Sequence, residues 1–439
     1  MKTTRCWLSA LCLALAAAAA RADDWPQWLG PQRDGVWRET GLLDRFPAGG
    51  PKVLWRAKIG GGYAGPAVAG GRVYVTDYVT DADLRKLNNP VGQPKVNGKE
   101  RVLCLDAKDG KELWKYEYDC PYAISYPAGP RCTPTVAGGK VYTLGAMGNL
   151  LCLDAQKGTL LWSKDFQKDY GAKVPMWGFA GHPLVEGDKL ICIVGGQGSL
   201  AVAFDKDTGK EKWKALSASE PGYSAPTVIE AGGKRQLVIW DADAIHGLGP
   251  ETGKVYWTEA LKPSFGMSIA TPRRAGDYLF AGGMGGKALL LRLAADRPAV
   301  EEVWRGQRDT AVYPSNSTPA AEGGTLYGCD SMEGDLRAVD LKTGKRLWKT
   351  FAPVAGERKT HGTAFLVKNG DRYFLFNEKG ELLIARLTPK GYEEVSRARL
   401  LEPTGEAFGR AVVWSHPAFA DKCVFARNDQ EIVCASLAK

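Results

Sequence analysis

The sequence has few histidines and lacks the short motifs of most metal and cofactor sites. Four His in 439 residues are too few to predict a histidine-built metal enzyme. No Cys-x-x-Cys occurs, which excludes a zinc ribbon or a thioredoxin-type site. There is no Gly-x-Ser-x-Gly elbow, no His-Glu-x-x-His motif and no P-loop. The sequence therefore offers no recognisable catalytic set.

Positive charge is moderate and dispersed, and no apolar run after the N-terminus is long enough to span a membrane. The net charge is +9 at pH 7. Lys2, Arg5 and Arg21 lie in a segment that we expect to be removed, which leaves about +6 on the mature chain. Because Lys and Arg do not cluster, no nucleic-acid partner is predicted.

Residues 1–22 have the organisation of a secretory signal peptide. Lys2 and Arg5 precede an apolar stretch, and Ala20 and Ala22 are the small residues that a signal peptidase reads. An uncleaved membrane anchor is the alternative, but the stretch is short and rich in alanine. We expect an exported protein, periplasmic or secreted, with no transmembrane segment in the mature chain.

Glycine is abundant, with 53 residues, and an internal repeat explains much of it. The phrase from Leu103 to Trp114 (LCLDAKDGKELW) recurs along the chain, and in five copies Gly stands four positions before Trp. The spacing of these tryptophans gives a period of about 47 residues, which is typical of a repeat fold. The tryptophans in the repeated position are Trp55, Trp114, Trp162, Trp213, Trp257, Trp304 and Trp348.

A second phrase, such as TPTVAGGKVYTL from Thr133, stands upstream in each repeat unit. Each unit holds four short apolar runs separated by turn signals, with no sustained helical period. Four strands per unit predict an all-β fold, an eight-bladed β-propeller of four-stranded antiparallel blades. The eight units begin at Gly65, Thr133, His182, Ala225, Thr271, Thr318, Gly362 and His416.

The ends of the chain predict how the ring closes. The last unit has room for three strands, and residues 52–59 resemble the missing fourth strand, with Trp55 in the repeated position. We therefore expect one propeller domain over residues 52–439, preceded by an N-terminal extension at 23–51. Residues 81–100 form the one long insertion, in the first blade; it is either a lid or partner contact for the channel or a tolerated surface loop.

The repeated phrase A-x-D-x-x-T-G-x-x-x-W resembles the tryptophan-docking motif of the PQQ-like repeat family, which includes the pyrroloquinoline-quinone (PQQ) dehydrogenases. The opening Trp25 to Gly35 (WPQWLGPQRDG) is similar to the start of exported bacterial propellers related to BamB, the outer-membrane assembly factor. The resemblance covers nearly the whole mature chain. It implies an eight-bladed propeller in which each Trp ring covers the seam to the next blade.

The resemblance also raises the question of PQQ and calcium. The dehydrogenases hold PQQ against a disulfide between adjacent cysteines and bind Ca²⁺ through Glu, Asn and a catalytic Asp. This chain has no Cys-Cys pair, no comparable calcium set and no Cys-x-x-Cys-His haem motif. PQQ and calcium are therefore expected only if the chain is a quinoprotein dehydrogenase-like oxidoreductase, and no metal site is predicted.

The links from the outer strand of one blade to the inner strand of the next hold the residues suited to binding. In a propeller these links lie on one face, beside the channel mouth, where aromatic and polar side chains can form a ligand pocket. For each histidine the structural alternative is a hydrogen bond to a neighbouring blade. Three His cannot share one metal, because blades three and seven lie opposite each other. The predicted ligand- or partner-binding residues are Tyr126, Arg131, Trp177, His182, Tyr223, Tyr313, Asn316, Arg358, His361, Arg410, Trp414 and His416.

Eight cysteines remain after the signal peptide, and an oxidising compartment permits disulfides. If Asn428 and Asp429 form a two-residue hairpin turn, Cys423 and Cys434 face each other across two strands. Cys120–Cys132, on either side of one loop, is the second candidate pair. Buried free thiols are the alternative.

These features favour a monomeric, exported propeller without catalytic activity. It would bind an envelope protein or a small ligand through its channel-mouth loops and serve in cell-envelope assembly. Two alternatives stay open: a quinoprotein dehydrogenase-like oxidoreductase, and a carbohydrate-binding propeller or polysaccharide lyase that uses the loops of Trp177 and Trp414.

Overall fold

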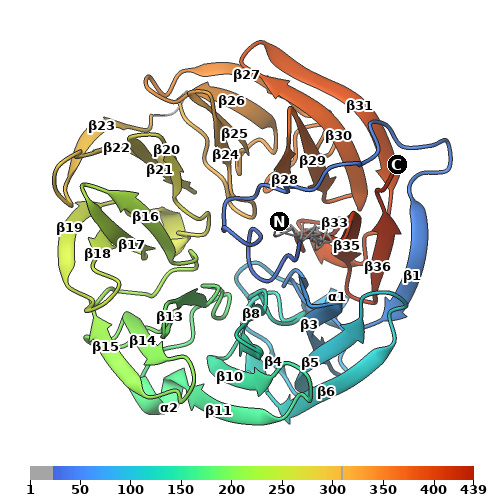
Figure 1. The fold of residues 1–439 in the computed structure, drawn as a ribbon, viewed down its shortest axis with the longest axis horizontal. Helices are drawn as coiled ribbons and strands as arrows, with labels where there is room; N and C mark the ends of the chain where they lie inside the picture. The colour runs from blue at the N-terminus through green and yellow to red at the C-terminus, as the bar shows by residue number, and fades with distance from the viewer. Residues whose placement is uncertain (1–22, 308–309) are drawn as a thin grey trace, which may run out of the picture.

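Eight four-stranded antiparallel sheets surround a central axis (Figure 1), which confirms the predicted all-β eight-bladed propeller. The computed structural model describes residues 23–307 and 310–439. The predicted signal peptide therefore lies outside the described residues. The first four blades are formed by β2 (Ala67–Ala69), β3 (Arg72–Val79), β5 (Lys99–Asp106) and β6 (Glu112–Asp119); β8 (Thr135–Ala137), β9 (Lys140–Leu144), β10 (Asn149–Asp154) and β11 (Leu160–Asp165); β12 (Leu184–Glu186), β13 (Lys189–Ile193), β14 (Ala201–Asp205) and β15 (Glu211–Ala215); and β16 (Thr227–Ala231), β17 (Lys234–Trp240), β18 (Ala244–Leu248) and β19 (Val255–Ala260).

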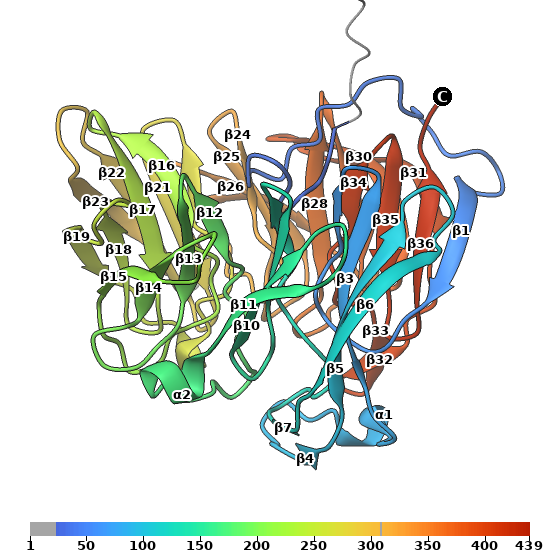
Figure 2. The ribbon, with the colours of Figure 1, turned by 60° about the horizontal axis from the view of Figure 1, so that its bottom comes forward.

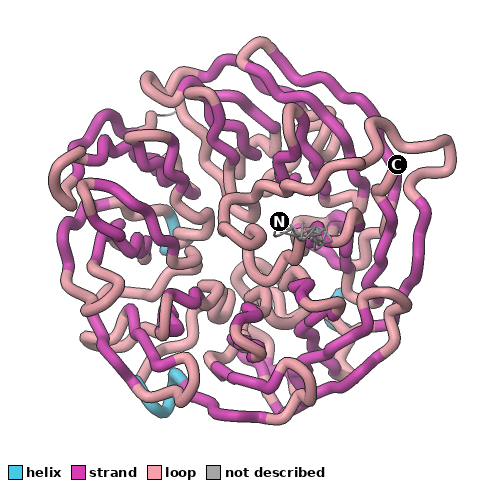
Figure 3. Tube along the Cα trace, viewed as in Figure 1, coloured by secondary structure: helices cyan, strands magenta, loops and turns pink. Residues whose placement is uncertain are grey.

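The other four blades repeat this order from the inner strand to the outer one. Helices are short, and Figure 3 shows strands and loops over nearly the whole trace. The strands of these blades are β20 (Arg273–Ala275), β21 (Tyr278–Gly283), β22 (Lys287–Leu293) and β23 (Val300–Arg305); β24 (Ala320–Glu322), β25 (Thr325–Cys329), β26 (Leu336–Asp340) and β27 (Arg346–Thr350); β28 (Ala364–Asn369), β29 (Arg372–Asn377), β30 (Glu381–Thr388) and β31 (Gly391–Arg399); and β34 (Ala418–Ala420), β35 (Cys423–Arg427), β36 (Glu431–Ser436) and β1 (Lys52–Lys58). Outside the blades are β4 (Lys95–Val96), β7 (Tyr122–Ala123), β32 (Gly405–Ala407), β33 (Arg410–Val412), α1 (Leu84–Leu87), α2 (Phe166–Tyr170) and the 3-10 turn η1 (Ser264–Gly266).

The ring is closed by β1, as the sequence predicts. This N-terminal strand pairs antiparallel with the C-terminal β36, from Lys52 opposite Ser436 to Lys58 opposite Glu431, with a bulge between Val53 and Trp55. The eighth blade thus has its fourth strand from the start of the chain, and the open edge of β36 is covered.

The repeated tryptophans lie on the seams between blades. The Nε1–H of Trp114 in the first blade donates to the carbonyl of Ala155 in the second, at 3.1 Å. A Cβ added to Gly158 of the second blade would lie 2.4 Å from the Trp114 ring, so only glycine lets the indole approach. Trp257 differs: its Nε1–H donates to Gln236 in its own blade, at 2.7 Å, because the fifth blade has no glycine in the repeated position.

Gly158→Ala is expected to destabilise the propeller through its clash with Trp114. Gly139→Ala is the matched control, since Gly139 also has a positive φ (76° against 69°) but has open space where a Cβ would stand. We expect the free energy of unfolding to fall by about 1–3 kcal/mol more for Gly158→Ala than for Gly139→Ala. Urea unfolding followed by tryptophan fluorescence measures the difference, and equal losses would contradict the packing role.

The N-terminal extension crosses the ring on one face and enters the channel (Figures 1 and 2). Trp25 exchanges two backbone hydrogen bonds with Val68 of β2. The Arg33 guanidinium donates to the carbonyls of His182, Pro183 and Pro226, at 3.1–3.3 Å, which ties the extension to blades three and four. The extension therefore links blades that are distant in the sequence.

The insertion in the first blade projects from the opposite face, where Figure 2 shows α1, β4 and β7 together. Its β4 pairs with β7 through Lys95–Ala123 and Val96–Tyr122. The Trp177 indole donates to the carbonyl of Pro90 at 3.0 Å, and the Ser125 hydroxyl donates to Gly92 at 2.7 Å. The insertion is thus tied to the link regions beside the channel mouth.

The two candidate disulfides are absent, because all eight cysteines of the described residues are free and buried. The hairpin that was expected to align Cys423 with Cys434 has a four-residue turn, Asn428 to Glu431, instead of two residues. The register places Phe425 opposite Cys434 and Ser436 opposite Cys423, so the two cysteines are diagonal neighbours and not a facing pair. Cys120 and Cys132 lie in separate hydrophobic clusters, with Sγ contacts to Asn149 and to the Phe179 carbonyl.

Candidate functional site

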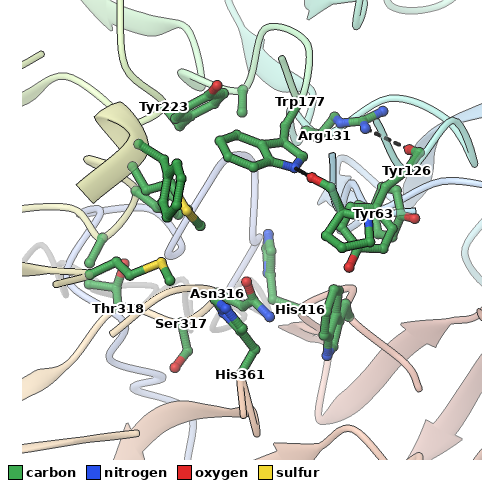
Figure 4. Close-up of a pocket in the computed structure, with 18 of the residues that line it drawn as sticks. Tyr63, Tyr126, Arg131, Trp177, Tyr223, Asn316, Ser317, Thr318, His361 and His416 are labelled. Atoms are coloured by element: carbon green, nitrogen blue, oxygen red, sulfur yellow. Dashed lines mark hydrogen bonds between the residues drawn. The ribbon is translucent and has the colours of Figure 1, made fainter. Parts of the chain in front are cut away.

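A pocket of about 340 Å³ lies at the channel mouth, where the links between blades converge (Figure 4). Its lining is mostly aromatic and aliphatic, with a few polar groups on the side of Asn316 and His361. The lining residues are Trp28, Tyr63, Pro90, Val91, Tyr126, Arg131, Trp177, Ala180, His182, Tyr223, Phe265, Met267, Ile269, Ala270, Met284, Asn316, Ser317, Thr318, His361, Phe365, Phe408, Trp414 and His416.

Aromatic pairs from different blades form the walls. Trp177 meets Tyr223 edge to face, with ring centroids 5.7 Å apart. Tyr126 and Trp414 make a similar contact at 5.8 Å. All four rings line the cavity, and aromatic rings in edge-to-face pairs suit the binding of a flat apolar group.

Trp28 of the N-terminal extension is also part of the pocket lining. Its ring stacks on His182 with centroids 4.1 Å apart and meets His416 edge to face at 4.2 Å. Its Nε1–H donates to the Thr271 hydroxyl at 2.9 Å. The extension therefore supplies a side chain that contacts blades three, five and eight within the channel.

Two of the pocket histidines are engaged by Thr133 of the second blade. The Thr133 backbone N–H donates to His182 Nδ1 at 2.8 Å, and its hydroxyl is 2.7 Å from His416 Nε2. His182 therefore acts as a structural acceptor for a neighbouring blade. The His361 ring stacks flat on Phe408, with centroids 4.9 Å apart, and makes no hydrogen bond to another of the residues that the structure describes.

Burial keeps these histidines neutral. Loss of hydration lowers the pKa of His361 and of His416 to about 4. Burial likewise lowers the pKa of His182, and the nearby His416 and Arg33 act in the same direction. At neutral pH the three imidazoles contribute no charge to the pocket.

The cations predicted for the site are occupied or distant. The Arg131 guanidinium donates to the carbonyls of Gly129, Ser125 and Tyr126. Arg410 is not among the lining residues and forms an ion pair with the buried Glu378, at 2.9 Å. Arg358 is exposed and does not line the pocket.

The pocket backbone holds several residues in the left-handed region that favours glycine. Tyr126, Phe265, His361 and Phe408 have φ between 50° and 58°, and all four line the cavity. Non-glycine residues with positive φ carry strain that concentrates at functional sites. Phe265 and Phe408 are also 67% and 45% exposed, so the strained turns present apolar rings to solvent.

The structure brings together nine of the twelve predicted residues: Tyr126, Arg131, Trp177, His182, Tyr223, Asn316, His361, Trp414 and His416. Tyr313, Arg358 and Arg410 do not line the pocket. Tyr313 is buried with its hydroxyl donating to the Gln307 carbonyl at 2.5 Å. Sequence reasoning missed Trp28, because the extension lies outside the repeat; the paired tryptophans of Trp25 to Gly35 were the available signal.

The comparison with protein families agrees with the repeat and the ring. The family model described as outer membrane protein assembly factor BamB matches residues 45–123, 98–350 and 245–439. The chain belongs to this BamB family. No curated protein matches this family member.

Solved structures support the fold of this BamB-family chain. BamB from Moraxella catarrhalis superposes with a TM-score of 0.52 at 16% identity, over 82% of this chain and 98% of that one. Quinohemoprotein alcohol dehydrogenase from Comamonas testosteroni gives 0.61 at 14% identity, over 96% and 82%. A europium-containing methanol dehydrogenase gives 0.60 at 13% identity, over 94% and 89%. At these identities the likeness shows the propeller fold alone.

No group of three or more His, Cys, Asp or Glu side chains is placed to hold a metal ion within residues 23–307 and 310–439. In the same ranges no helix has the length and apolar character needed to cross a membrane.

Proposed function

We propose that this BamB-family chain is an exported, monomeric binding protein without catalytic activity, which engages an envelope protein or a small ligand through its channel-mouth loops. The observation that carries the proposal is the aromatic pocket at the mouth, which Trp28 of the N-terminal extension also lines. Exposed Val91, Phe265 and Phe408 line the same cavity, at 66%, 67% and 45% exposure. Apolar side chains exposed around a concave site are typical of binding surfaces. The family and these loops together favour a role in cell-envelope assembly.

The polar groups of the pocket support binding more than catalysis. No Asp or Glu is among its lining residues, so the pocket has no carboxylate acid or base of its own. His182 and His416 are engaged by Thr133, and the Thr318 hydroxyl accepts from the Thr271 backbone N–H at 3.1 Å. These groups hold blades together.

The dehydrogenases of similar fold suggest a quinone cofactor as the alternative, and the pocket residues do not fit PQQ with calcium. PQQ carries three carboxylates, and Ca²⁺ takes six to eight oxygen ligands, usually including carboxylates. The pocket lining includes no carboxylate, and its only guanidinium, on Arg131, is used by backbone carbonyls. We therefore derive no oxidation step for this chain.

A carbohydrate ligand is also less well supported. Trp177 and Trp414 both line the pocket, but their indole N–H groups donate to Pro90 and Glu378. A sugar requires several directed hydrogen bonds besides an aromatic face. The pocket lining is mainly apolar and has few free polar groups, so it suits a sugar less well than an apolar ligand.

Site-directed photocrosslinking tests the proposed binding face. We expect p-benzoylphenylalanine at position 265 or 408 to capture the same envelope protein, while the same group at Leu113 captures none. Leu113 is a matched control, because it is 44% exposed but lies on the outer strand β6. Adducts from position 113 alone, or dye-linked turnover of alcohols or sugars with added PQQ and Ca²⁺, would contradict the proposal.

A further inference from the structure

The pocket lining carries one formal charge, the guanidinium of Arg131, and the buried Glu100 outside the lining acts on it as an opposite charge. The lining contains no acidic residue, and its single guanidinium donates to the carbonyls of Ser125 and Tyr126 at 2.8 and 2.6 Å. Burial keeps His361 and His416 neutral at pH 7. An ionised ring that entered would lose its hydration, and a guanidinium whose N–H groups already donate to backbone carbonyls would replace only part of it.

The pocket also has flat walls on several sides. Trp177 and Tyr223 belong to the links before blades three and four, and Tyr126 and Trp414 form a second edge-to-face pair. Figure 4 shows Tyr223, Trp177 and Tyr126 following one another along one rim of the pocket. Met267 and Ile269 add aliphatic surface to the lining. A planar ring inserted here gains stacking and edge contacts with the walls. Its binding is also favoured by a hydrophobic free energy proportional to the apolar area that the ring and the walls bury.

We propose that the pocket binds an uncharged planar ring system, of the size of a naphthyl or indole group, and discriminates against ionised rings of the same shape. This inference rests on the proposed binding function and specifies the ligand chemistry of that site. The ring is carried either by a free small molecule or by a side chain of the protein partner, and both sources share this chemistry.

The insertion of the first blade sets the access to this site. Pro90 and Val91 line the cavity, and the loop around them is held by the hydrogen bonds of Trp177 to Pro90 and of Ser125 to Gly92. Asn88 adds a third, from its side-chain amide to the Glu406 carbonyl at 3.0 Å. The loop therefore forms part of the pocket wall, and its Val91 presents an apolar side chain at the entrance.

A pair of fluorescent dyes tests the charge discrimination. N-phenyl-1-naphthylamine is uncharged, and 1-anilinonaphthalene-8-sulfonate has the same ring system with an added sulfonate. Titration of the mature protein with each dye at pH 7 is expected to give at least about tenfold tighter binding of the uncharged dye, because the sulfonate must be desolvated. Equal or tighter binding of the sulfonate dye would overturn the proposal.

Substitutions assign the binding to this pocket. Trp177→Ala and Phe408→Ala are each expected to weaken binding of the uncharged dye by about tenfold, as expected for loss of a stacking wall. Phe351→Ala, an aromatic residue outside the pocket, is the control and should leave binding unchanged. Binding that is insensitive to both pocket substitutions would also overturn the proposal.

Ile269→Lys provides a reciprocal test that does not depend on loss of packing. Ile269 lines the cavity and is only partly buried, so a lysine there can place its ammonium in the pocket while the fold is kept. We expect the substitution to reverse the preference toward the sulfonate dye, by about tenfold. An unchanged preference, in a variant with the native melting temperature, would contradict a charge-based selection.

Competition with the photocrosslink separates the two sources of the ring. If saturating N-phenyl-1-naphthylamine abolishes the adduct from position 408, the ring belongs to the protein partner. If the adduct persists while the dye stays bound, the ring belongs to a separate small molecule. Failure of the dye experiment with a successful crosslink would refute the ligand chemistry but leave the proposed binding face intact.

Discussion

A chain that begins at Gly60 is expected to lose cooperative unfolding altogether. It lacks β1, so β36 becomes an open edge, and it lacks the extension that packs on the channel face. Trp25, Trp37 and Trp55 are all buried, and each contributes roughly 2–3 kcal/mol of apolar burial. Their sum is comparable with the net stability of a typical domain, about 5–15 kcal/mol. Circular dichroism during heating measures the loss.

Complementation provides the control for this deletion. A peptide of residues 23–59 added to the truncated chain is expected to restore a cooperative transition, whereas a scrambled peptide of the same composition is not. The truncated chain could also melt within a few degrees of the full mature chain without any peptide. In that case closure by β1 would contribute little, and the stability of the ring would have to come from the seams between the other blades.

Acidification from pH 7 to pH 4 is expected to destabilise the protein through its buried histidines. In the unfolded chain a histidine has a pKa of about 6.5, whereas burial lowers the pKa of His361 and His416 to about 4 in the folded protein. Between these values the unfolded state binds protons that the folded state does not, so stability falls as the pH falls through this window. The expected loss is about 2–3 kcal/mol for each of these two histidines.

His361→Phe isolates the contribution of one histidine. The His361 ring stacks on Phe408, so a phenyl ring preserves the shape of the contact. Urea unfolding at several pH values should show a shallower decline for the variant, by about 2–3 kcal/mol between pH 7 and pH 4. Carboxylates titrate in both proteins and cancel in the comparison. Parallel curves would mean that His361 is already accessible to protons in the folded state.

The repeat made the ring predictable, because each blade satisfies the same local rules. The repeat requires glycine at Gly158 and at the same position of other blades, because an indole from the preceding blade occupies the space of a side chain. The strand at 52–59 could be assigned to the last blade because Trp55 stands in the repeated position. Trp257 departs from the pattern where the fifth blade lacks that glycine, which the degenerate copy before Trp304 already indicated.

The pocket could be predicted in outline but not in its depth or charge. Because the blades repeat around one axis, the links between them must converge at the channel mouth. This predicted that Trp177, Tyr223 and Trp414 lie close together, and all three line the pocket. Trp28 could not be placed, because no periodicity connects the extension to the blades. The pairing of Arg410 with Glu378 and the four-residue turn after Arg427 depend on contacts and turn geometry that spacing does not specify.

The pairing of β1 with β36 also bears on the order of folding. The strand β1 is synthesised first, but its partner β36 is synthesised last. It therefore remains unpaired until the chain is nearly complete. Closing a loop of this length is entropically costly and slow in comparison with the hairpins inside each blade. Because the extension that carries Trp28 is joined to β1, we expect the pocket to be completed in the final step, after the individual blades have formed. A nascent or truncated chain would therefore have blades without a binding site.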